Sequence, residues 1–455
     1  MFINKLESSL KDYLPNSYKK ISLILSSALQ AVNPYDVVKS AIIREGEQVS
    51  INGKTYYLND YEKIYLIGIG KASILMSLGL EDILGDQIRQ GIVITKYLPV
   101  SSVLPENIET IIGNHPVPDA QSLAAGKQLL SFLQNINEND LVFCLISGGG
   151  SALVTLPEDG ITLNEIAELN SVLLQCGASI NEINCIRKHV DRLKGGGVIQ
   201  YGASAQWITL VLSDVVSNSL DVIASGPTFP DPTTFEDACG IIENYGLVDK
   251  ISTTIYQYLL DGKDGKQPET LKPGNSKFRK MENRILASNE HAAAAAKNTC
   301  LELGFDASIF STTCQGEARL VGGDFAEMIK TIKSKSHPSQ KPTCIIVGGE
   351  TTVTVKGNGF GGRNLEVALS AAKKISGLED VALITLATDG EDGPTDAAGA
   401  VVTGETFDRA AKQGLSLQDY LERNDSYHFF EQVGGLIKTG STGTNVNDLT
   451  FLFVF

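Results

Sequence analysis

The stretch LVFCLISGGGSA, residues 141–152, joins an apolar run to three consecutive glycines. This order predicts a buried strand that leads through a tight turn into a helix. Consecutive glycines let backbone N–H groups form a nest, and a helix N-terminus adds partial positive charge, so phosphate binding is the natural use. The alternative is a turn that needs glycine only for steric reasons. The candidate phosphate-binding residues are Ser147, Gly148, Gly149, Gly150 and Ser151.

Similar junctions recur along the first half of the chain. Short apolar runs end in loops rich in Gly, Ser, Asn and Asp, and stretches of helical character separate most of them. Such alternation predicts a mostly parallel, doubly wound sheet whose binding loops gather at the carboxyl ends of the strands. The runs, each with the loop that follows, are 64–67 with 68–71, 91–95 with Lys96, 110–112 with 113–116, and 207–212 with 213–214.

A polar, charged segment with Gly and Pro, residues 261–283, interrupts this pattern and is typical of a linker. Before the first strand, apolar residues at helical spacing predict helix up to about residue 45. The expected domains are residues 1–260 and residues 284–455. The apolar runs that predict strands in the second domain are 284–287, 344–347, 381–387 and 449–454.

The composition is typical of a globular protein of two or three domains. The chain has 455 residues, a formal net charge of −15 and a pI near 4.9. Nucleic acids and anionic membranes bind clustered Lys and Arg, so this balance argues against both as partners. The seven cysteines form no C-x-x-C pair and the five histidines are isolated, which favours a reducing compartment over a disulfide framework or a zinc site. The sequence has no signal peptide and no apolar run of about 18 residues, so we expect a cytoplasmic protein.

A second glycine loop, GIGK at residues 68–71, presents Lys71 at a strand end. Tyr65 and Ala72 stand where a Walker A loop needs Gly and Ser or Thr. A dinucleotide fold needs an acid at the end of the second strand, where this chain has Lys96, and this weakens an NAD interpretation. Lys71 is well placed to bind a carboxylate or a phosphate, and a solvated surface lysine is the alternative.

The densest basic stretch of the chain is residues 184–197, which include Lys188, His189 and Lys194. These side chains could gather around a polyphosphate, and Lys194 is a candidate nucleotide-binding residue. For any single residue of this stretch, a solvated helix face is the favoured interpretation.

Two loops of the second half carry charges suited to phosphate chemistry. The Gly-rich loop 357–366 contains Arg363, whose planar fork matches a carboxylate or a phosphate, and its glycines suggest closure over a ligand. The loop 388–396 follows an apolar run and supplies clustered carboxylates. Asp389 and Asp392 suit Mg²⁺, which takes one or two carboxylates together with substrate phosphates. An acidic turn is the alternative.

Other loops add weaker candidates. Asp214 and Glu350 lie just past strand ends, and the Gly/Thr-rich loop 439–445, with Thr442 and Asn445, could contact phosphate or ribose. Phosphoryl transfer depends on positioning, cations and a metal, which these loops together could supply. The same parts would also suit a nucleotide-binding protein that is not a kinase.

In their order along the chain, these motifs resemble class II glycerate kinases. This family joins an N-terminal glycerate-kinase-like domain to a C-terminal MOFRL domain, and its members are often labelled hydroxypyruvate reductases. The resemblance covers nearly the whole chain, from residue 68 to residue 448. The matching stretches are 68–71, 114–119, 147–152, 187–189, 194–196, 212–215, 224–228, 361–364, 388–399 and 442–448.

The resemblance implies ATP-dependent phosphorylation of D-glycerate, with 2-phosphoglycerate as the usual product. It implies a Rossmann-like α/β/α N-terminal domain and a smaller mixed-sheet α/β C-terminal domain, with the active site in the cleft between them. By the same analogy, Lys71 and Arg363 face each other across the cleft. Two positions depart from the family pattern, since Leu365 replaces the usual Gln and Ser441 the usual Pro.

Our hypothesis from the sequence assigns a role to each candidate. Lys71 or Arg363 holds the carboxylate of glycerate or a similar hydroxy acid, the 147–151 loop holds the ATP phosphates, and Asp389 or a neighbouring acid holds Mg²⁺. Asp214 or Asp389 accepts the hydroxyl proton. The alternatives are an NAD(P)H-dependent hydroxypyruvate reductase and a non-catalytic protein that binds a nucleotide or a sugar acid. We expect a small-molecule substrate as partner, and a homodimer stays open.

Overall fold

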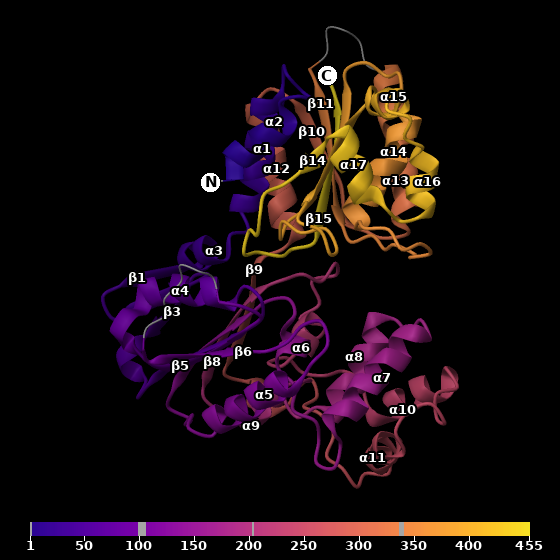
Figure 1. Ribbon diagram of the computed structural model, residues 1–455. Helices are drawn as coiled ribbons and strands as arrows, with labels where there is room; N and C mark the ends of the chain where they lie inside the picture. The colour runs from indigo at the N-terminus through magenta and orange to yellow at the C-terminus, as the bar shows by residue number, and fades with distance from the viewer. Residues whose placement is uncertain (1, 99–105, 203, 336–340) are drawn as a thin grey trace. The chain divides into compact units, whose positions relative to one another are not determined.

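The computed structural model describes residues 2–98, 106–202, 204–335 and 341–455. The chain forms two compact units (Figure 1). One unit is Pro34–Leu286, and the other combines Met1–Asn33 with Ala287–Phe455. The expected boundary grouped the opening residues with the N-terminal domain, whereas the structure packs them in the C-terminal unit. Apolar spacing reveals that a helix has a buried face, but not which sheet that face covers.

A six-stranded sheet organises the unit Pro34–Leu286. Neighbouring strands from β6 to β8 are parallel. From β4 the chain moves through β5 to the edge strand β6, then returns to the other side of β4 for β7. Ligands of open α/β sheets bind at such a switch of direction, here between the carboxyl ends of β4 and β7. The spatial order is β6 (Ile108–Ile112), β5 (Ile88–Thr95), β4 (Ile64–Ile69), β7 (Leu141–Ile146), β8 (Gln206–Leu212) and β9 (Met281–Ala287).

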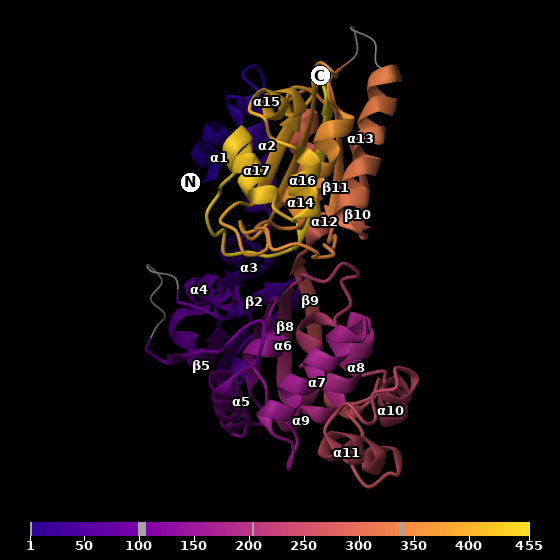
Figure 2. The ribbon, with the colours of Figure 1, turned by 45° about the vertical axis from the view of Figure 1, so that its right-hand side comes forward.

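Helices cover both faces of this sheet (Figures 1 and 2). Helix α4 (Ser73–Leu84) packs on one face, and α5 (Ala120–Leu133) and α9 (Gly197–Tyr201) pack on the other. Every residue of β4 and β7 is buried, as expected for parallel strands covered on both sides. The predicted Rossmann-like, doubly wound α/β/α fold is therefore confirmed.

Four helices of the same unit form a separate apolar core. Three of them begin with a capping box, in which Thr162, Ser179 or Thr234 exchanges hydrogen bonds with an acid three residues later. The helices are α7 (Leu163–Gln175), α8 (Ile180–Val190), α10 (Phe235–Asn244) and α11 (Thr253–Lys263).

The basic stretch 184–197 lies inside the protein. Lys188 is 3% exposed and Lys194 is 6% exposed, so the interpretation as a solvated helix face is wrong for both. The ammonium group of Lys188 lies 3.2 Å from Asp221 and 3.3 Å from Asp231. Buried lysines need such partners because an unpaired charge in the interior is very costly. Sequence reasoning missed these partners because they come from a different loop.

The N-terminal region differs in part from the predicted helix. It is helical in α1 (Phe2–Leu10), α2 (Tyr18–Gln30) and α3 (Pro34–Ala41). At Ile42 the chain turns into an antiparallel three-stranded sheet, since the β-branched pair Ile42-Ile43 favours extended backbone. Its strands are β1 (Ile42–Glu45), β2 (Gln48–Ile51) and β3 (Lys54–Tyr57).

A mixed sheet organises the C-terminal unit. Strands β10 and β11 are parallel, whereas β15, the last strand of the chain, runs antiparallel to both of its neighbours, β11 and β12. The predicted mixed-sheet α/β domain is therefore confirmed. The spatial order is β10 (Asp306–Cys314), β11 (Thr343–Gly349), β15 (Asp448–Val454), β12 (Val381–Ala387), β13 (Gly399–Thr403) and β14 (Leu436–Ile437).

Helices also cover both faces of the mixed sheet (Figure 1). Helices α1, α2 and α12 (Asn289–Glu302) lie on one side, with α2 packed along α12. On the other side, α13 (Ala318–Lys335) and α14 (Arg363–Lys374) pack against each other and share an apolar core with the strands. The remaining elements are α6 (Gly150–Leu153), α15 (Thr406–Lys412), α16 (Leu417–Glu422), α17 (Ser426–Val433) and single turns at Leu58–Asp60, Gly85–Gln87, Ile223–Ser225 and Ser276–Phe278.

Among the described residues, no helix combines the length and the apolar character needed to cross a membrane.

Candidate active site

The two glycine loops predicted to bind anions meet at the switch point of the parallel sheet. The loop after β4 presents Lys71, and the loop after β7 contains the three glycines. The N–H of Lys71 donates to the carbonyl of Gly148 at 3.0 Å, and the N–H of Ala72 donates to Oγ of Ser147 at 3.0 Å. Ser147 therefore fixes one loop against the other, which is a structural role.

Close approach of neighbouring groups explains two of the glycines. A Cβ on Gly148 would collide with the carboxylate of Asp214. Gly149 has φ +83°, and a Cβ there would lie 3.1 Å from Cδ2 of His115 and 3.2 Å from Cε of Lys71. Asp214, His115 and Lys71 thus surround the backbone of this loop.

The backbone of the glycine loop offers free donors. Within the described part of the chain, the N–H groups of residues 148–151 have no hydrogen-bond acceptor. Gly148 and Gly150 are buried, and buried N–H groups are almost always paired in folded proteins. Four successive donors without an acceptor therefore suit an anionic ligand, in addition to the steric reasons for glycine.

A strained turn supports the glycine loop from the β8 side. Ala224 and Ser225 have φ of +52° and +60°, which is rare for residues other than Gly. The hydroxyl of Ser225 lies 2.8 Å from that of Ser151 and 3.0 Å from Oδ1 of Asn184. Sequence reasoning did not assign Asn184 or Ser225, because a positive φ at Ala-Ser has no sequence signal of its own.

Lys71, the cationic side chain of this cluster, has no counter-ion in the part of the chain that the structure describes. No ion pair joins the ammonium group of Lys71 to a carboxylate among the described residues, although 23 ion pairs occur there. Burial lowers the pKa of the neighbouring His115 to about 4, with further contributions from the charges of Lys71 and Lys96. The surroundings of His115 are therefore electropositive.

Lys194 was predicted to bind nucleotide, but its charge is already engaged. It forms a buried ion pair with Asp191 and donates to the carbonyl of Val154 at 3.3 Å. Burial lowers the pKa of Lys194, and Asp191 opposes this shift. These contacts give Lys194 the role of fixing the chain that follows α6.

The second set of candidate residues lies at one end of the mixed sheet. Asp448, at the start of β15, pairs across the sheet with Gly349 of β11 and Ala387 of β12. Because β15 is antiparallel to both neighbours, its amino end meets their carboxyl ends. This arrangement brings together the loops that carry Glu350 and Asp389.

Arg363, the first residue of α14, is held by two of these carboxylates. Its Nε lies 2.5 Å from Oδ2 of Asp448, and one terminal nitrogen lies 2.6 Å from Oε1 of Glu350. Burial lowers the pKa of Arg363, but Asp448 and then Glu350 outweigh burial and raise it above the ordinary value. The guanidinium is thus fully charged, and a substrate anion would share it with Asp448 and Glu350.

The remaining residues predicted for this region are also close to one another. The carbonyl of Asp389 accepts from the N–H of Thr442 at 3.1 Å, and Thr442 Oγ1 donates to the carbonyl of Thr388 at 2.6 Å. Asn445 Oδ1 accepts from the N–H of Asn447 at 3.0 Å. The hydroxyl of Thr442 thus holds the Asp389 turn in place.

The carboxylate of Asp392 caps the amino end of α14. It is 1% exposed, and its Oδ1 accepts from the N–H and the side-chain amide of Asn364 at 3.0 and 3.2 Å. Its Oδ2 accepts from the N–H of Leu365 at 2.8 Å. These bonds direct both oxygens at the helix start, so Asp392 positions Arg363 instead of holding Mg²⁺ as predicted. Leu365, where the family usually has Gln, lies with its side chain in the apolar core.

The buried carboxylate of Asp392 should make the folding stability of the protein depend on pH. Burial raises the pKa of Asp392 to about 7, the charge of Asp448 adds to this, and the N–H groups at the helix start oppose it. Between the ordinary pKa of 3.8 and about 7, the unfolded chain releases this proton while the folded protein keeps it. Folding stability therefore falls as pH rises through this range, by about 1.4 kcal/mol for each unit.

Asp392→Asn should remove that dependence. We expect urea unfolding at pH values between 4 and 8 to show that the wild-type protein loses a few kcal/mol more than Asp392→Asn as pH rises. Asp408→Asn, at an exposed position of α15, is the matched control and should follow the wild type. Identical pH curves for all three proteins would contradict a titrating cap.

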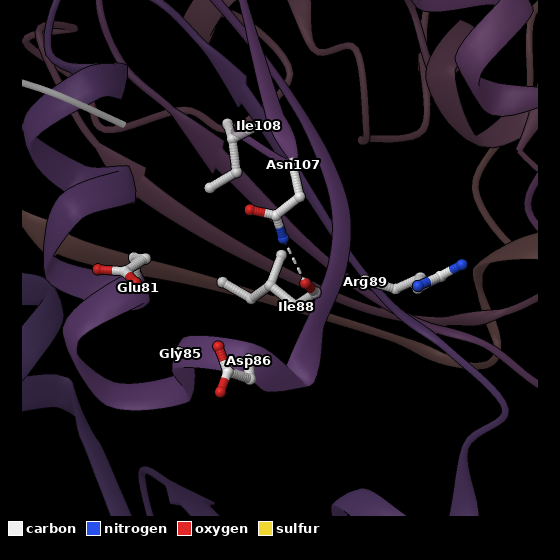
Figure 3. A pocket seen from close by; sticks show the side chains of 7 residues that line it. All are labelled: Glu81, Gly85, Asp86, Ile88, Arg89, Asn107 and Ile108. Atoms are coloured by element: carbon white, nitrogen blue, oxygen red, sulfur yellow. Dashed lines mark hydrogen bonds between the residues drawn. The ribbon is translucent and has the colours of Figure 1, made fainter. Parts of the chain in front are cut away.

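Metal-binding clusters and two cavities bear on the extent of the site, and the smaller cavity is lined in part by Gly349, Asn364 and Asp448. Among the described residues, no group of three or more His, Cys, Asp or Glu side chains is arranged to hold a metal ion. A cavity lined by Glu81, Asp86, Arg89 and Asn107 lies beside the amino ends of β5 and β6 (Figure 3). The candidate loops follow carboxyl ends, so this cavity is separate from them.

Comparisons with known proteins agree with this architecture. Residues 20–260 match the family described as Domain of unknown function (DUF4147), and residues 343–448 match the MOFRL family. Glycerate 2-kinase of Pyrococcus horikoshii is 40% identical to this chain and covers 95% of it, with 96% of that protein matched. D-glycerate 2-kinase of Thermotoga maritima is 40% identical, with 96% and 98% matched.

Solved structures match equally well. The glycerate kinase structure from Thermotoga maritima has a TM-score of 0.83 and 39% identity, over 96% of this chain and 99% of that chain. A Pyrococcus horikoshii structure has a TM-score of 0.80 and 39% identity, over 96% and 98%. A doubly wound sheet with two glycine loops at its switch point, joined to a unit built on a mixed sheet, defines a two-domain α/β enzyme. The chain belongs to the glycerate kinase family, as the motifs of its sequence predicted.

Proposed function

We propose that this chain transfers the γ-phosphoryl group of ATP to the 2-hydroxyl of D-glycerate, which gives 2-phosphoglycerate and ADP. The proposal rests on the cluster at the switch point, where the ammonium group of Lys71 adjoins four backbone N–H groups, and none of these groups has a partner among the residues that the structure describes. Such a cluster offers what phosphoryl transfer needs, namely fixed donors and positive charge around the phosphates. The names of the glycerate 2-kinases from two organisms support the same reaction and the same substrate.

The proposal assigns a separate role to each group of residues. The N–H groups of residues 148–151 bind phosphate oxygens of ATP, and Lys71 stabilises the charge on the group in transfer. The glycerate hydroxyl oxygen forms a bond to Pγ, and the bond from Pγ to the bridging oxygen of ADP breaks. Arg363 binds the glycerate carboxylate or the phosphoryl oxygens, in exchange for part of its contact with Glu350. Asp214 and Asp389 are the sequence-based candidates for the proton acceptor.

Only some of the predicted metal ligands are suited to bind Mg²⁺. Asp389 and Asp214 are half-buried carboxylates beside the two sets of loops, and each could contribute one ligand, as Mg²⁺ sites with substrate phosphates require. Asp392 does not suit this role, because its oxygens accept hydrogen bonds at the start of α14. When bound, Mg²⁺ would neutralise charge on the phosphates of ATP.

A second candidate function is reduction of hydroxypyruvate with NADPH. A protein of Agrobacterium vitis that is 36% identical to this chain, over 86% of each, is provisionally named a hydroxypyruvate reductase. Lys96 stands where an NAD-binding fold needs an acid, and a lysine there could only favour the 2′-phosphate of NADP. The free N–H groups and Lys71 favour the kinase.

One assay distinguishes these functions. Purified protein is incubated with ATP, Mg²⁺ and D-glycerate while ADP release is followed and the product is identified as 2- or 3-phosphoglycerate by ³¹P NMR. We expect glycerate-dependent ADP and 2-phosphoglycerate, with none in the control without glycerate. Oxidation of NADPH by hydroxypyruvate, without ADP release, would favour the reductase. Thermal stabilisation by ATP without turnover of a panel of hydroxy acids would favour a binding protein.

A further inference from the structure

His115 and Lys96 are side chains near the switch point that the proposed reaction does not yet use. Lys96 follows the carboxyl end of β5, and His115 follows that of β6. With Lys71 after β4, they come from three neighbouring parallel strands, so their loops lie at the same edge of the sheet. This group lies on the β5–β6 side of the switch point, whereas the glycine loop and Asp214 follow β7 and β8.

The loop that carries His115 is firmly attached. A Cβ on Gly113 would collide with the carbonyl of Leu153, so the loop lies directly against the end of α6, the helix that the glycine loop opens. The N–H of Asn114 donates to Oγ of Ser122 at 3.0 Å, which joins the loop to α5. These contacts give the motif Asn-His-Pro-Val-Pro-Asp at 114–119 a physical reason, namely to hold His115 beside Gly149.

The imidazole of His115 is half-buried and available for a ligand. Among the described residues, neither ring nitrogen has a hydrogen-bond partner, and no carboxylate contacts the ring. The charged groups that act on it are the ammonium groups of Lys71 and Lys96, which together with burial lower its pKa to about 4. The ring is therefore neutral at physiological pH, with one nitrogen able to accept a proton.

We propose that Lys96 and His115 complete an acceptor site for a small 2-hydroxy acid, in which Lys96 binds the carboxylate beside Lys71 and His115 accepts the hydroxyl proton. This inference rests on the proposed kinase function. A carboxylate bound at Lys96 offsets part of the positive field at His115, so the imidazole becomes a better base when the substrate binds. The hydroxyl oxygen then attacks Pγ, its proton moves to the free ring nitrogen of His115, and ADP leaves.

Kinetics of matched variants test the two roles separately. We expect His115→Gln to lower kcat/KM for D-glycerate by about 100-fold or more, as for loss of a general base, with KM for ATP within about twofold. Lys96→Gln should raise KM for D-glycerate by about tenfold with little change in kcat. Lys127→Gln, at an exposed position of α5, controls for the loss of a surface charge. Wild-type kcat/KM in His115→Gln would overturn the role of His115, and an unchanged KM in Lys96→Gln that of Lys96.

A titration that does not depend on turnover tests the same site. Histidine ¹⁵N NMR of the wild-type protein should give a His115 pKa near 4 that rises by at least about one unit with saturating D-glycerate. The signal is assigned by its loss in His115→Gln. If the wild-type protein phosphorylates no hydroxy acid but this shift occurs, the proposed reaction fails while the binding site stands. If D-glycerate does not change the pKa of His115, the proposed acceptor site is refuted even when the protein is an active kinase.

Discussion

Lys71→Ala should lower kcat/KM for D-glycerate by about a thousandfold or more while the protein stays folded. Lys71 is the cation at the switch point, and removal of a charge that stabilises a transferring phosphoryl group costs about 10³ or more in rate. The fold should survive because the ammonium group makes no ion pair among the described residues and its backbone holds the loop through Gly148. Steady-state kinetics and thermal unfolding measured on the same preparations check both halves of the prediction.

A matched control makes this result specific. Lys63→Ala removes an exposed lysine just before β4 and should leave both kcat/KM and the unfolding midpoint unchanged. Lys71→Arg keeps the charge but replaces a compact ammonium group with a wider fork, so it should recover only part of the activity. Near-normal turnover by Lys71→Ala would remove Lys71 from the mechanism.

The sequence predicted the switch-point loops because their signal is local. Each is an apolar strand followed directly by glycines, and parallel strands necessarily bring such ends together. Lys71 and the loop 147–151 therefore meet as expected. Asp214 and Glu350 were also predicted from their positions just past strand ends. In the structure, Asp214 lies against Gly148 and Glu350 forms an ion pair with Arg363.

Contacts between distant segments could not be predicted in this way. The partners of Lys188 lie 33 and 43 residues away, so a basic stretch in the sequence looked solvated although it is buried. Asp392 looked like a metal ligand because it belongs to an acidic turn, but the donors that occupy it come from α14, 27 and 28 residues away. Residue type alone cannot tell a carboxylate that faces a substrate from one that faces a helix end.

Arg363→Ala should abolish turnover and also destabilise the protein, unlike Lys71→Ala. We expect kcat/KM to fall by about 10³-fold or more, because an arginine on a transferring phosphoryl group contributes on that scale. Asp448, whose side chain is 11% exposed, would lose its ion pair with Arg363. A largely buried carboxylate without its partner is costly, so the free energy of unfolding should fall by about 2 kcal/mol.

A double variant separates the two effects of Arg363. Arg363→Ala with Asp448→Asn removes the unpaired charge, so it should regain much of the lost stability while turnover stays abolished. Urea unfolding gives the first quantity and ADP release the second. If turnover returned with stability, Arg363 would act only by keeping the end of the mixed sheet folded, and the anion site there would have to be assigned to another residue. If neither returned, Asp448 itself would have a role in the reaction beyond its ion pair with Arg363.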